Sequence, residues 1–299
     1  MVRVRKRILG SRTYYYLEHS TRVHGVVRKR ERYLGRSLPR NLDLVKGEFL
    51  QEIREERWTP ALEAIQRGYV EDLRRTPSSA RGRDLESFAV RFTYNTQRIE
   101  GSTLTLRETA NLLVRGVTPS ERPLRDVKEA EAHRDVFLSI LKERKDLSLA
   151  LVLRWHHEMF RATRPDLAGR IRAHQVAISG SRFVPPTPVE VYPLLREFFR
   201  WYDRAKGTTH PVELAALVHL KFVSVHPFSD GNGRVARLLM NFVLHRRRFP
   251  MMDIPYVGRN SYYGALERAQ IGKNDSVFVE WCLRRYVREN RRFLLKRSR

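Results

Sequence analysis

Apolar residues recur at helical spacing through most of the chain after Asn41. A period of three to four residues buries one face of a helix and does not suit the two-residue alternation of a strand. Breaks rich in Gly, Pro, Ser or Thr, such as residues 76–79, separate the periodic stretches. The pattern predicts a mainly α fold, a helical bundle in which Asp84 is an N-cap. The expected helices cover residues 42–69, 84–99, 105–114, 126–143, 147–163, 188–206, 212–225 and 235–246.

The first 40 residues differ in composition, with twelve Lys or Arg residues and only two acids. Residues 12–18 and 26–34 are aromatic and β-branched, with Gly25 between them, which predicts a short antiparallel hairpin extension. A two-stranded ribbon is marginal alone, so we expect it to pack on the main domain or on a partner. Basic residues beside Tyr14, Tyr15 and Tyr16 suit a nucleic-acid surface. A solvated hairpin face explains them equally well.

A second β pattern interrupts the helices between residues 169 and 188. Two short runs flank a small polar turn, and together they read Val176, Ala177, Ile178, Ser179, Gly180, Ser181, Arg182, Phe183 and Val184. The pattern predicts a small β-hairpin. Because strand edges recruit extended peptides, we expect it to act as a flap or binding edge.

The chain of 299 residues carries 58 basic and 33 acidic residues, a formal net charge of +25. Arginine binds phosphate in a planar fork, so nucleic acid, ribosome or an acidic protein surface would suit this charge. A genome-wide preference for arginine codons, or adaptation to heat, would also produce it. Charge alone therefore assigns no function.

Cysteine usage and hydropathy bear on the compartment. A single cysteine, Cys282, excludes an internal disulfide framework and suits a reducing compartment, so we expect a cytoplasmic protein. No stretch approaches the ~20 apolar residues of a membrane span, and the N-terminus lacks the apolar run of a secretory signal. We therefore expect no membrane partner.

One loop carries most of the recognisable chemistry. Residues 226–237 read HPFSDGNGRVAR and precede a predicted helix. The turn at Gly231, Asn232 and Gly233 allows positive φ angles, and its backbone N–H groups converge on one point. The N-terminus of the following helix adds its partial positive charge there. This arrangement predicts an anion site.

The side chains around this turn suit nucleotide chemistry. Arg234 and Arg237 are three residues apart, so both can reach phosphates from the first helical turn. Asp230 offers hard oxygen atoms, which suit Mg²⁺ bridging phosphates. His226 titrates near neutral pH and can take a proton from an attacking hydroxyl. The loop therefore predicts a phosphate site beside a general base.

These residues resemble, at every specified position, the signature HxFx(D/E)GNGRxxR of the Fic family. The resemblance extends over roughly residues 86–284. Residues 210–213 and Phe222 resemble the helix that precedes the motif in this family. The segment 169–188 is similar to the flap that aligns a target by strand addition, and residues 262–266 are similar to the helix that lines the adenosine pocket.

The resemblance implies transfer of AMP from ATP to a Ser, Thr or Tyr hydroxyl of a target protein, on a Fic-type helical bundle with a β-hairpin flap. It implies a general base (His226), a ligand of Mg²⁺ (Asp230), an anion hole for the α-phosphate (Gly231, Asn232 and Gly233), a group that neutralises pyrophosphate (Arg234) and one that grips the γ-phosphate (Arg237). Tyr262, Tyr263 and Gln270 become candidates for adenine or ribose contacts, and residues 178–184 for target docking.

A shorter motif precedes the core. Residues 96–101, TQRIEG, fit the inhibitory pattern (S/T)xxxE(G/N) of this family through Thr96, Glu100 and Gly101. A helix C-terminus ended by glycine is the simpler explanation of the same residues. The resemblance implies that Glu100 pairs with Arg237 in the place of the γ-phosphate. We therefore expect the resting protein to be nearly inactive.

Other functions fit the same residues. Glu100 could activate water, so that the site removes AMP from a modified protein, and the site could instead transfer UMP, phosphocholine or phosphate. A function of another class is binding of nucleic acid or ribosome through the basic N- and C-termini. The target protein is not identified by the sequence, and a homodimer stays open.

The domain organisation expected from these patterns has four parts. They are a basic hairpin extension (1–40), a helical segment (41–84), a Fic core with the inhibitory helix around 86–101 (85–284) and an Arg-rich tail (285–299).

Overall fold

The computed structural model describes residues 2–23 and 26–294. The chain divides into two compact units, Met1–Glu63 and Ala64–Arg299. Helix α1 (Leu42–Arg75) contributes to both. The four-part division expected from the sequence stays a prediction.

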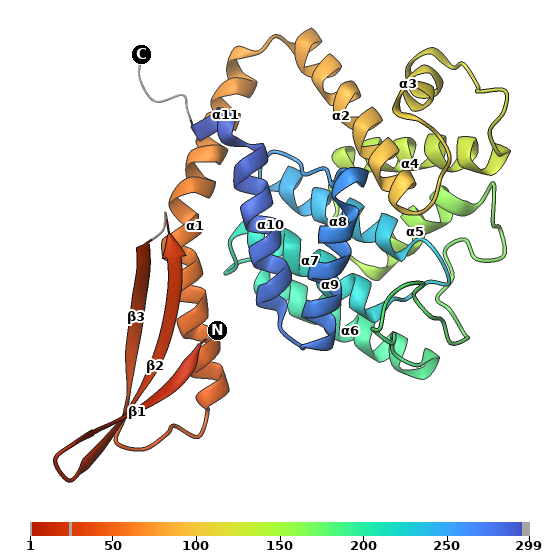
Figure 1. Ribbon diagram of the computed structural model, residues 1–299. Coiled ribbons are helices and arrows are strands. Elements are labelled where there is room, and N and C mark those ends of the chain that lie inside the picture. Colours follow the sequence, from red (N-terminus) through yellow and green to blue (C-terminus); the bar gives the residue numbers. More distant parts are fainter. Residues whose placement is uncertain (1, 24–25, 295–299) are drawn as a thin grey trace. The chain divides into compact units, whose positions relative to one another are not determined.

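The first unit holds a three-stranded antiparallel sheet in the order β1 (Arg3–Leu9), β2 (Arg12–Val23), β3 (Val26–Gly35) (Figure 1). The predicted pairing of β2 with β3 is confirmed, and the turn expected at Gly25 lies outside the described residues. The structure adds β1, which pairs along β2 from Arg3 opposite Glu18 to Leu9 opposite Arg12. The sequence did not predict strand β1, because cationic residues occupy alternate positions in it and the positions between them hold both polar and apolar residues. No regular alternation of polar and apolar residues therefore appears.

The second unit is helical, and the mainly α class is confirmed. Helices α7 and α8 pack against each other at its centre, where α2, α4 and α5 contact α8, and α6 and α10 contact α7. Helix α7 is apolar nearly all round, as a central helix must be. The elements are α2 (Ser78–Ile99), α3 (Leu106–Arg115), α4 (Leu124–Lys142), α5 (Leu149–Phe160), α6 (Pro188–Ala205), α7 (Pro211–Val225), α8 (Asn232–Arg246), the 3-10 helix η1 (Tyr256–Gly258), α9 (Arg259–Ile271), α10 (Asp275–Glu289) and α11 (Arg291–Leu294).

Two helix starts differ from the prediction by three residues or more. Helix α2 begins at Ser78, so Asp84 lies inside it and the predicted N-cap at Asp84 is wrong. Pro77 occupies the cap position with φ −56°, which suits the start of a helix rather than a break. Helix α8 begins at Asn232, three residues earlier than expected, directly after Gly231.

The predicted β-hairpin at residues 176–184 is not formed, since the structure assigns no strand to any residue there. The turn itself is present, because Ser181 N donates to Ile178 O at 3.1 Å and Gly180 has a φ of +73°. Pro185 and Pro186 follow at once and lack the N–H groups that a ladder needs. The Glu267 carboxylate holds the turn instead, accepting from Arg182 N at 2.6 Å.

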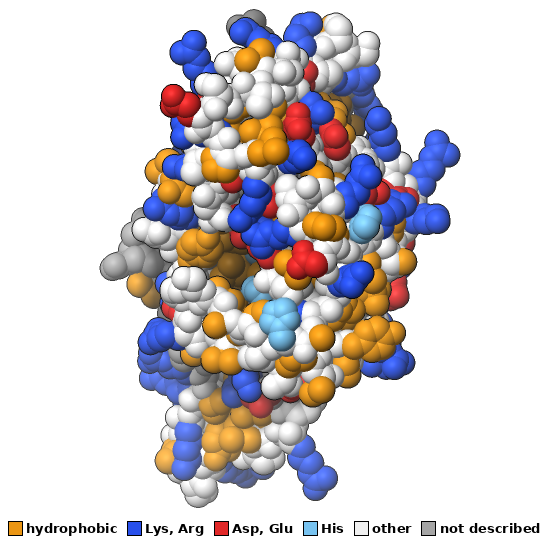
Figure 2. Space-filling model, turned by 90° about the vertical axis from the view of Figure 1, so that its right-hand side faces the viewer, with side chains coloured by type: hydrophobic (Ala, Val, Ile, Leu, Met, Phe, Trp, Pro, Cys, Tyr) orange, Lys and Arg blue, Asp and Glu red, His pale blue; other side chains and the backbone are white. Residues whose placement is uncertain are grey.

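Lys and Arg side chains are spread over the whole of the face shown in Figure 2, and they outnumber acidic side chains there. The charge on this face is therefore not gathered into one site. Within residues 2–23 and 26–294, none of the helices combines the length and the apolar character needed to cross a bilayer.

Candidate active site

His226 follows the last residue of α7 in the left-handed conformation, with φ 51° and ψ 57°. This conformation is uncommon and costly for a residue other than glycine. Its Nδ1 lies 3.2 Å from Val223 O, and because a carbonyl only accepts, this contact places the proton on Nδ1. Burial lowers the pKa of His226 below the ordinary 6.5. The imidazole is therefore neutral at pH 7, with Nε2 available as a base.

Two side chains hold the loop after His226 in shape. The Asn232 amide pairs twice with the Phe228 backbone, accepting from its N–H at 2.9 Å and donating to its carbonyl at 2.8 Å. The ring of His156 stacks on Phe228 with centroids 3.7 Å apart, and its Nε2 lies 3.0 Å from Asp230 O. Its Nδ1 accepts from Gly169 N, so Nε2 carries the proton and donates. His156 gave no recognisable signal in the sequence.

Both glycines of the turn lie close to other side chains. Gly231 has a φ of +81°, and a Cβ there would lie 2.4 Å from the Phe160 ring. A Cβ on Gly233 would lie 2.5 Å from Glu100 Oε1. Because α8 begins at Asn232, the first N–H groups of this helix lack intrahelical partners and are available to an anion.

Arg237 is almost fully buried, with 1% of its side chain exposed. Its Nη2 lies 2.6 Å from Glu100 Oε1, so the predicted ion pair is present. Nη2 also donates to Thr96 O at 3.2 Å, and Nε donates to Thr96 Oγ1 at 3.3 Å. A buried guanidinium needs such partners, because an unpaired charge in the interior is costly.

Arg234 is equally buried, but its partners are different. It pairs with Glu129 on α4 and, at 3.0 Å, with Asp230, and its Cζ lies 4.5 Å from the centre of the Phe160 ring. Glu129 is a further site residue that sequence reasoning missed. A lone acid 105 positions before its partner carries no local pattern.

The end of α2 is tied to three other helices. Besides the Glu100 pair with α8, the Tyr263 hydroxyl donates to Ile99 O at 2.9 Å, and Gln97 Nε2 donates to Glu129 O at 2.9 Å. Gly101, with a φ of +99°, lets the chain turn away directly after Glu100. Glu100 is therefore held rigidly over the start of α8.

Asp230 is the one candidate metal ligand predicted from the sequence. Its carboxylate accepts from Gly231 N at 2.6 Å and pairs with Arg164 at 2.6 Å. Across the described ranges no group of three His, Cys, Asp or Glu residues is placed to hold a metal ion. Mg²⁺ usually binds one or two carboxylates plus substrate phosphates and waters. Asp230 therefore fits Mg²⁺ only together with a nucleotide. Binding of the ion would break the ion pair between Asp230 and Arg164. The sequence did not indicate this pair.

The three residues of α9 that are candidates for adenine or ribose contacts have different surroundings. Tyr262 is 1% exposed and donates to His219 Nε2 at 2.9 Å while accepting from Arg237 Nη1, so its ring has no exposed face for an adenine. Burial lowers the pKa of His219 to about 3, which keeps it a neutral acceptor. Tyr263 is 44% exposed and contacts the end of α2.

Gln270, the third candidate, lines a cavity of about 390 Å³. Its Nε2 donates to Ser224 Oγ at 3.1 Å, two residues before His226. Phe183 of the flap segment lines the same cavity, together with Trp201 and Lys221. The structure therefore brings Gln270 and the flap segment to one hollow beside His226, within the size range of ligand pockets.

Arg172 connects the flap segment to the loop and was also missed. Its buried guanidinium donates to three carbonyls, those of His226 at 2.8 Å, His174 at 3.0 Å and Pro186 at 2.5 Å. In the part of the chain that the structure describes, each of its three side-chain nitrogens bonds to a carbonyl oxygen. Burial lowers its pKa from the ordinary value. These bonds tie the flap segment to the backbone of His226.

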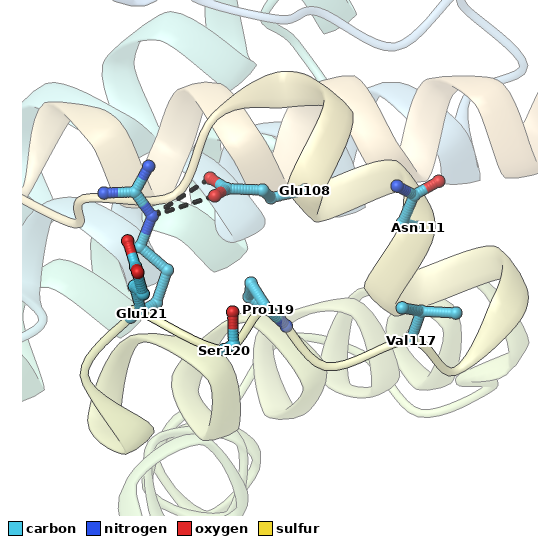
Figure 3. Close-up of a pocket in the computed structure, with 7 residues that line it drawn as sticks. Glu108, Asn111, Val117, Pro119, Ser120 and Glu121 are labelled. Carbon is cyan, nitrogen blue, oxygen red and sulfur yellow. Dashed lines mark hydrogen bonds and ion pairs between the residues drawn. The ribbon is translucent and has the colours of Figure 1, made fainter.

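A second hollow, of about 290 Å³, lies between α3 and the loop at residues 117–122 that leads to α4 (Figure 3). Glu108, Asn111, Pro119 and Glu121 are among its lining residues. Arg122, its one cationic lining residue, is tied to both oxygens of Glu108 at 3.0 and 3.1 Å. The hollow therefore offers no unpaired cation or base comparable to the loop at His226.

The chain is similar to known proteins both in sequence and in structure. A sequence model of the Fic/DOC family matches residues 146–244. A protein adenylyltransferase of Caenorhabditis elegans, fic-1, is 36% identical over 230 residues, which are 72% of this chain and 45% of that protein. A protein adenylyltransferase Fic of Drosophila yakuba is 35% identical over 189 residues, 60% of this chain and 37% of that protein. The chain thus spans less than half the length of these curated relatives.

Solved structures are similar over more of the chain. Residues 134–508 of Fic-1 from Caenorhabditis elegans superpose with a TM-score of 0.70 at 30% identity, covering 86% of this chain and 78% of that one. A Fic domain containing signaling protein from Bacteroides thetaiotaomicron gives a TM-score of 0.71 at 26% identity, covering 78% of this chain and 95% of that one.

Proposed function

Because this chain belongs to the Fic/DOC family, we propose that it is a protein adenylyltransferase, which transfers AMP from ATP to a Ser, Thr or Tyr hydroxyl of a target protein. The observation that carries the proposal is the position of His226. Its Nδ1 is committed to Val223 O, and it begins the loop that ends in the anion site at Gly231 to Gly233.

In the proposed reaction the target hydroxyl oxygen attacks the α-phosphorus of ATP while Nε2 of His226 takes the hydroxyl proton. A bond forms between this oxygen and the α-phosphorus, and the bond from the α-phosphorus to the oxygen that bridges to the β-phosphorus breaks. Pyrophosphate leaves. N–H groups at the start of α8 stabilise the charge that develops on the α-phosphate, and Arg234 and Arg237 face the phosphates that depart.

Mg²⁺ is part of the proposal, with Asp230 as its protein ligand. When bound, the ion would neutralise phosphate charge and fix the phosphate chain for in-line attack. The carboxylate is about a quarter exposed and lies beside the anion site, which supports this assignment. Arg164 would then have to release Asp230 when the nucleotide arrives.

The Glu100 pair supports a resting state of low activity. Arg237 cannot grip a γ-phosphate with Nη2 while Glu100 Oε1 holds that nitrogen. We expect ATP to bind with its α-phosphate turned away from attack until Glu100 leaves.

The test is incorporation of labelled AMP from ATP and Mg²⁺, including self-modification, by the Glu100→Gly variant. Glu100→Gly should incorporate label, and the double variant with His226→Ala should not. Transfer that survives His226→Ala would overturn the role of His226. Unlabelled UTP, GTP and CTP are added as competitors to check the nucleotide. If the site is specific for ATP, none of them should reduce labelling from ATP.

Removal of AMP from a modified protein is the second candidate, and the position of Glu100 favours it. Its carboxylate stands directly over Gly233, at the anion site, where it could orient a water molecule. A purified protein labelled by Glu100→Gly should then lose its label with the wild type but not with Glu100→Gly. Equal loss with both would dismiss hydrolysis by Glu100.

A cytoplasmic location and an unidentified target protein complete the proposal. The location rests on the single cysteine, Cys282, which is a buried free thiol. The turn at residues 178–184 is the proposed target contact, because Arg172 fixes the base of that segment to His226.

A further inference from the structure

The β1–β3 sheet has two faces of different character. Cross-strand pairing places every second residue on the same face. One face packs on the first turns of α1, where Arg32 lies over the Phe49 ring at 5.3 Å and pairs with Glu48 at 3.8 Å. We call the other face the outer face. Its side chains include Arg3, Arg5, Arg7, Arg12, Tyr14, Tyr16, Glu18, Lys29, Glu31 and Tyr33, together with Leu9, Ser20 and Val27.

Three tyrosines form a platform on the outer face. The Tyr33 ring centre lies 5.3 Å from that of Tyr16 and 6.3 Å from that of Tyr14. Tyr33 is 53% exposed. Tyr14 and Tyr16 are partly buried, and their rings are tilted by 45° and 48° to the Tyr33 ring. Each such ring offers a stacking surface for a planar group.

Cations surround this platform in fixed positions. Arg7 Cζ lies 4.5 Å from the centre of the Tyr16 ring, and its Nη2 pairs with Glu31 at 2.5 Å. Lys29 bridges both acids of the face, at 2.7 Å from Glu18 and 3.0 Å from Glu31. Ordered side chains lose little freedom when a ligand binds.

The outer face keeps an excess of positive charge after these pairings. The side chains named on this face include five cations and two acids, an excess of three positive charges. Within the described residues no ion pair engages Arg3 or Arg12. A ligand that matches both the charge and the platform must combine a row of anions with flat aromatic groups.

We propose that the outer face binds a single-stranded polynucleotide, with phosphates on its arginines and bases stacked on Tyr33 and its neighbours. An acidic peptide would use the cations but leave the tyrosine platform without a partner. A duplex keeps its bases stacked on one another, so a flat face reaches only its phosphates. This function is separate from nucleotide transfer at His226.

The first experiment measures binding of the full chain by fluorescence anisotropy. The probes are 20-residue oligo(dT) and oligo(rU) strands, a 20-base-pair DNA duplex and a polyglutamate peptide. We expect at least one single strand to bind at least tenfold more tightly than the duplex or the peptide, and the tighter strand identifies DNA or RNA as the source. Between 50 and 200 mM salt its affinity should fall roughly 20- to 100-fold, for three to five phosphate contacts.

The second experiment uses matched variants. Tyr33→Ala should weaken single-strand binding at least fivefold, while Tyr33→Phe, which keeps the ring, should stay within twofold. Arg3→Gln on the outer face should weaken binding more than Lys6→Gln, which removes the same charge from the opposite face. Circular dichroism of each variant checks that the fold is kept.

The proposal is overturned if the duplex or polyglutamate binds as tightly as the strands, if Tyr33→Ala has no effect, or if Arg3→Gln and Lys6→Gln lose equal affinity. The double variant Glu100→Gly with His226→Ala separates the two proposals. It should bind the strand normally while transferring no AMP.

Discussion

Glu100 Oε1 lies 2.6 Å from Arg237 Nη2, and the two residues join the end of α2 to the second turn of α8. The pair is sheltered, because Arg237 is 1% exposed and Glu100 24%. The main effect of Glu100 on the chemistry should therefore be competition with phosphate for one guanidinium.

Replacement of Glu100 should release transfer activity. A hydrogen bond to a charged group contributes about 1.5–3 kcal/mol, so Glu100→Gly should raise the initial rate of AMP incorporation roughly 10- to 100-fold. Glu100→Gln keeps the shape without the charge and should give an intermediate rate. Equal rates in the wild type and Glu100→Gly would contradict competition at Arg237.

The pH dependence of transfer should follow His226. Burial lowers the pKa of its imidazole, so the base stays deprotonated and active to below pH 6.5 and is lost as the pH falls through the lowered pKa. Glu100 raises this pKa by its charge, so Glu100→Gly should move the acid limb further down. Rates of Glu100→Gly measured from pH 5 to 8 check this. A half-maximal rate above pH 6.5 would be inconsistent with His226 as the base.

Arg172 should matter for transfer more than for nucleotide binding. Lysine cannot serve the three carbonyls that the guanidinium fork joins. In the Glu100→Gly background, Arg172→Lys should lower self-modification about tenfold and leave the Kd for ATP within twofold. The two quantities are measured by label incorporation and by calorimetry. A tenfold loss of ATP affinity would instead place Arg172 in nucleotide binding.

Gly231 should tolerate no side chain. Alanine there meets the Phe160 ring as well as the unfavourable φ of +81°, so Gly231→Ala should lower the free energy of unfolding by about 3 kcal/mol. Gly180→Ala is the matched control, since its φ is +73° but no atom lies within 4 Å of the added Cβ. The control should lose only about 1 kcal/mol. Urea unfolding of both variants measures the two losses in free energy of unfolding. Similar losses would mean that the Phe160 ring moves easily to make room for the added methyl group.

Asp253 should make stability depend on pH. Its Oδ2 accepts from Asn95 Nδ2 at 2.6 Å, Oδ1 has no donor among the described residues, and burial raises its pKa to about 7. The folded protein then binds more protons than the unfolded chain between about pH 4 and 7. The free energy of unfolding should therefore fall over that range, by at most about 4 kcal/mol. Asp253→Asn should remove this slope in urea unfolding at pH 5, 6, 7 and 8. A slope that persists in the variant would assign it to other groups.

The site at the loop from His226 to Arg237 could be predicted because its functional residues lie close together in the sequence. The family and the mainly α class are confirmed, and the Glu100–Arg237 pair is present as the motif at residues 96–101 implied. The roles of these residues in transfer stay predictions. Local sequence was sufficient wherever the interacting residues share a turn or a known motif.

Other features depend on contacts that no local pattern encodes. Glu129, His156 and Arg172 reach the loop from distant segments, and each looks like an ordinary helix or loop residue in the sequence. The strands expected in the flap segment failed for another reason. Alternation at residues 176–184 suggested strand pairing. Pro185 and Pro186, however, have no backbone N–H to donate to a strand ladder, and the N–H of Arg182 donates to the Glu267 carboxylate.

The absence of a side chain on Gly233 leaves a space that Glu100 Oε1 fills, 2.5 Å from where a Cβ would stand. An anion that belongs to the same chain is already at the site and does not have to diffuse there, so it competes more effectively than a free anion of equal intrinsic affinity. A nucleotide must displace the Glu100 carboxylate before its phosphates reach Arg237. The threshold for activity would then be set by how firmly α2 is anchored, so a partner that loosens α2 could switch the site without touching it.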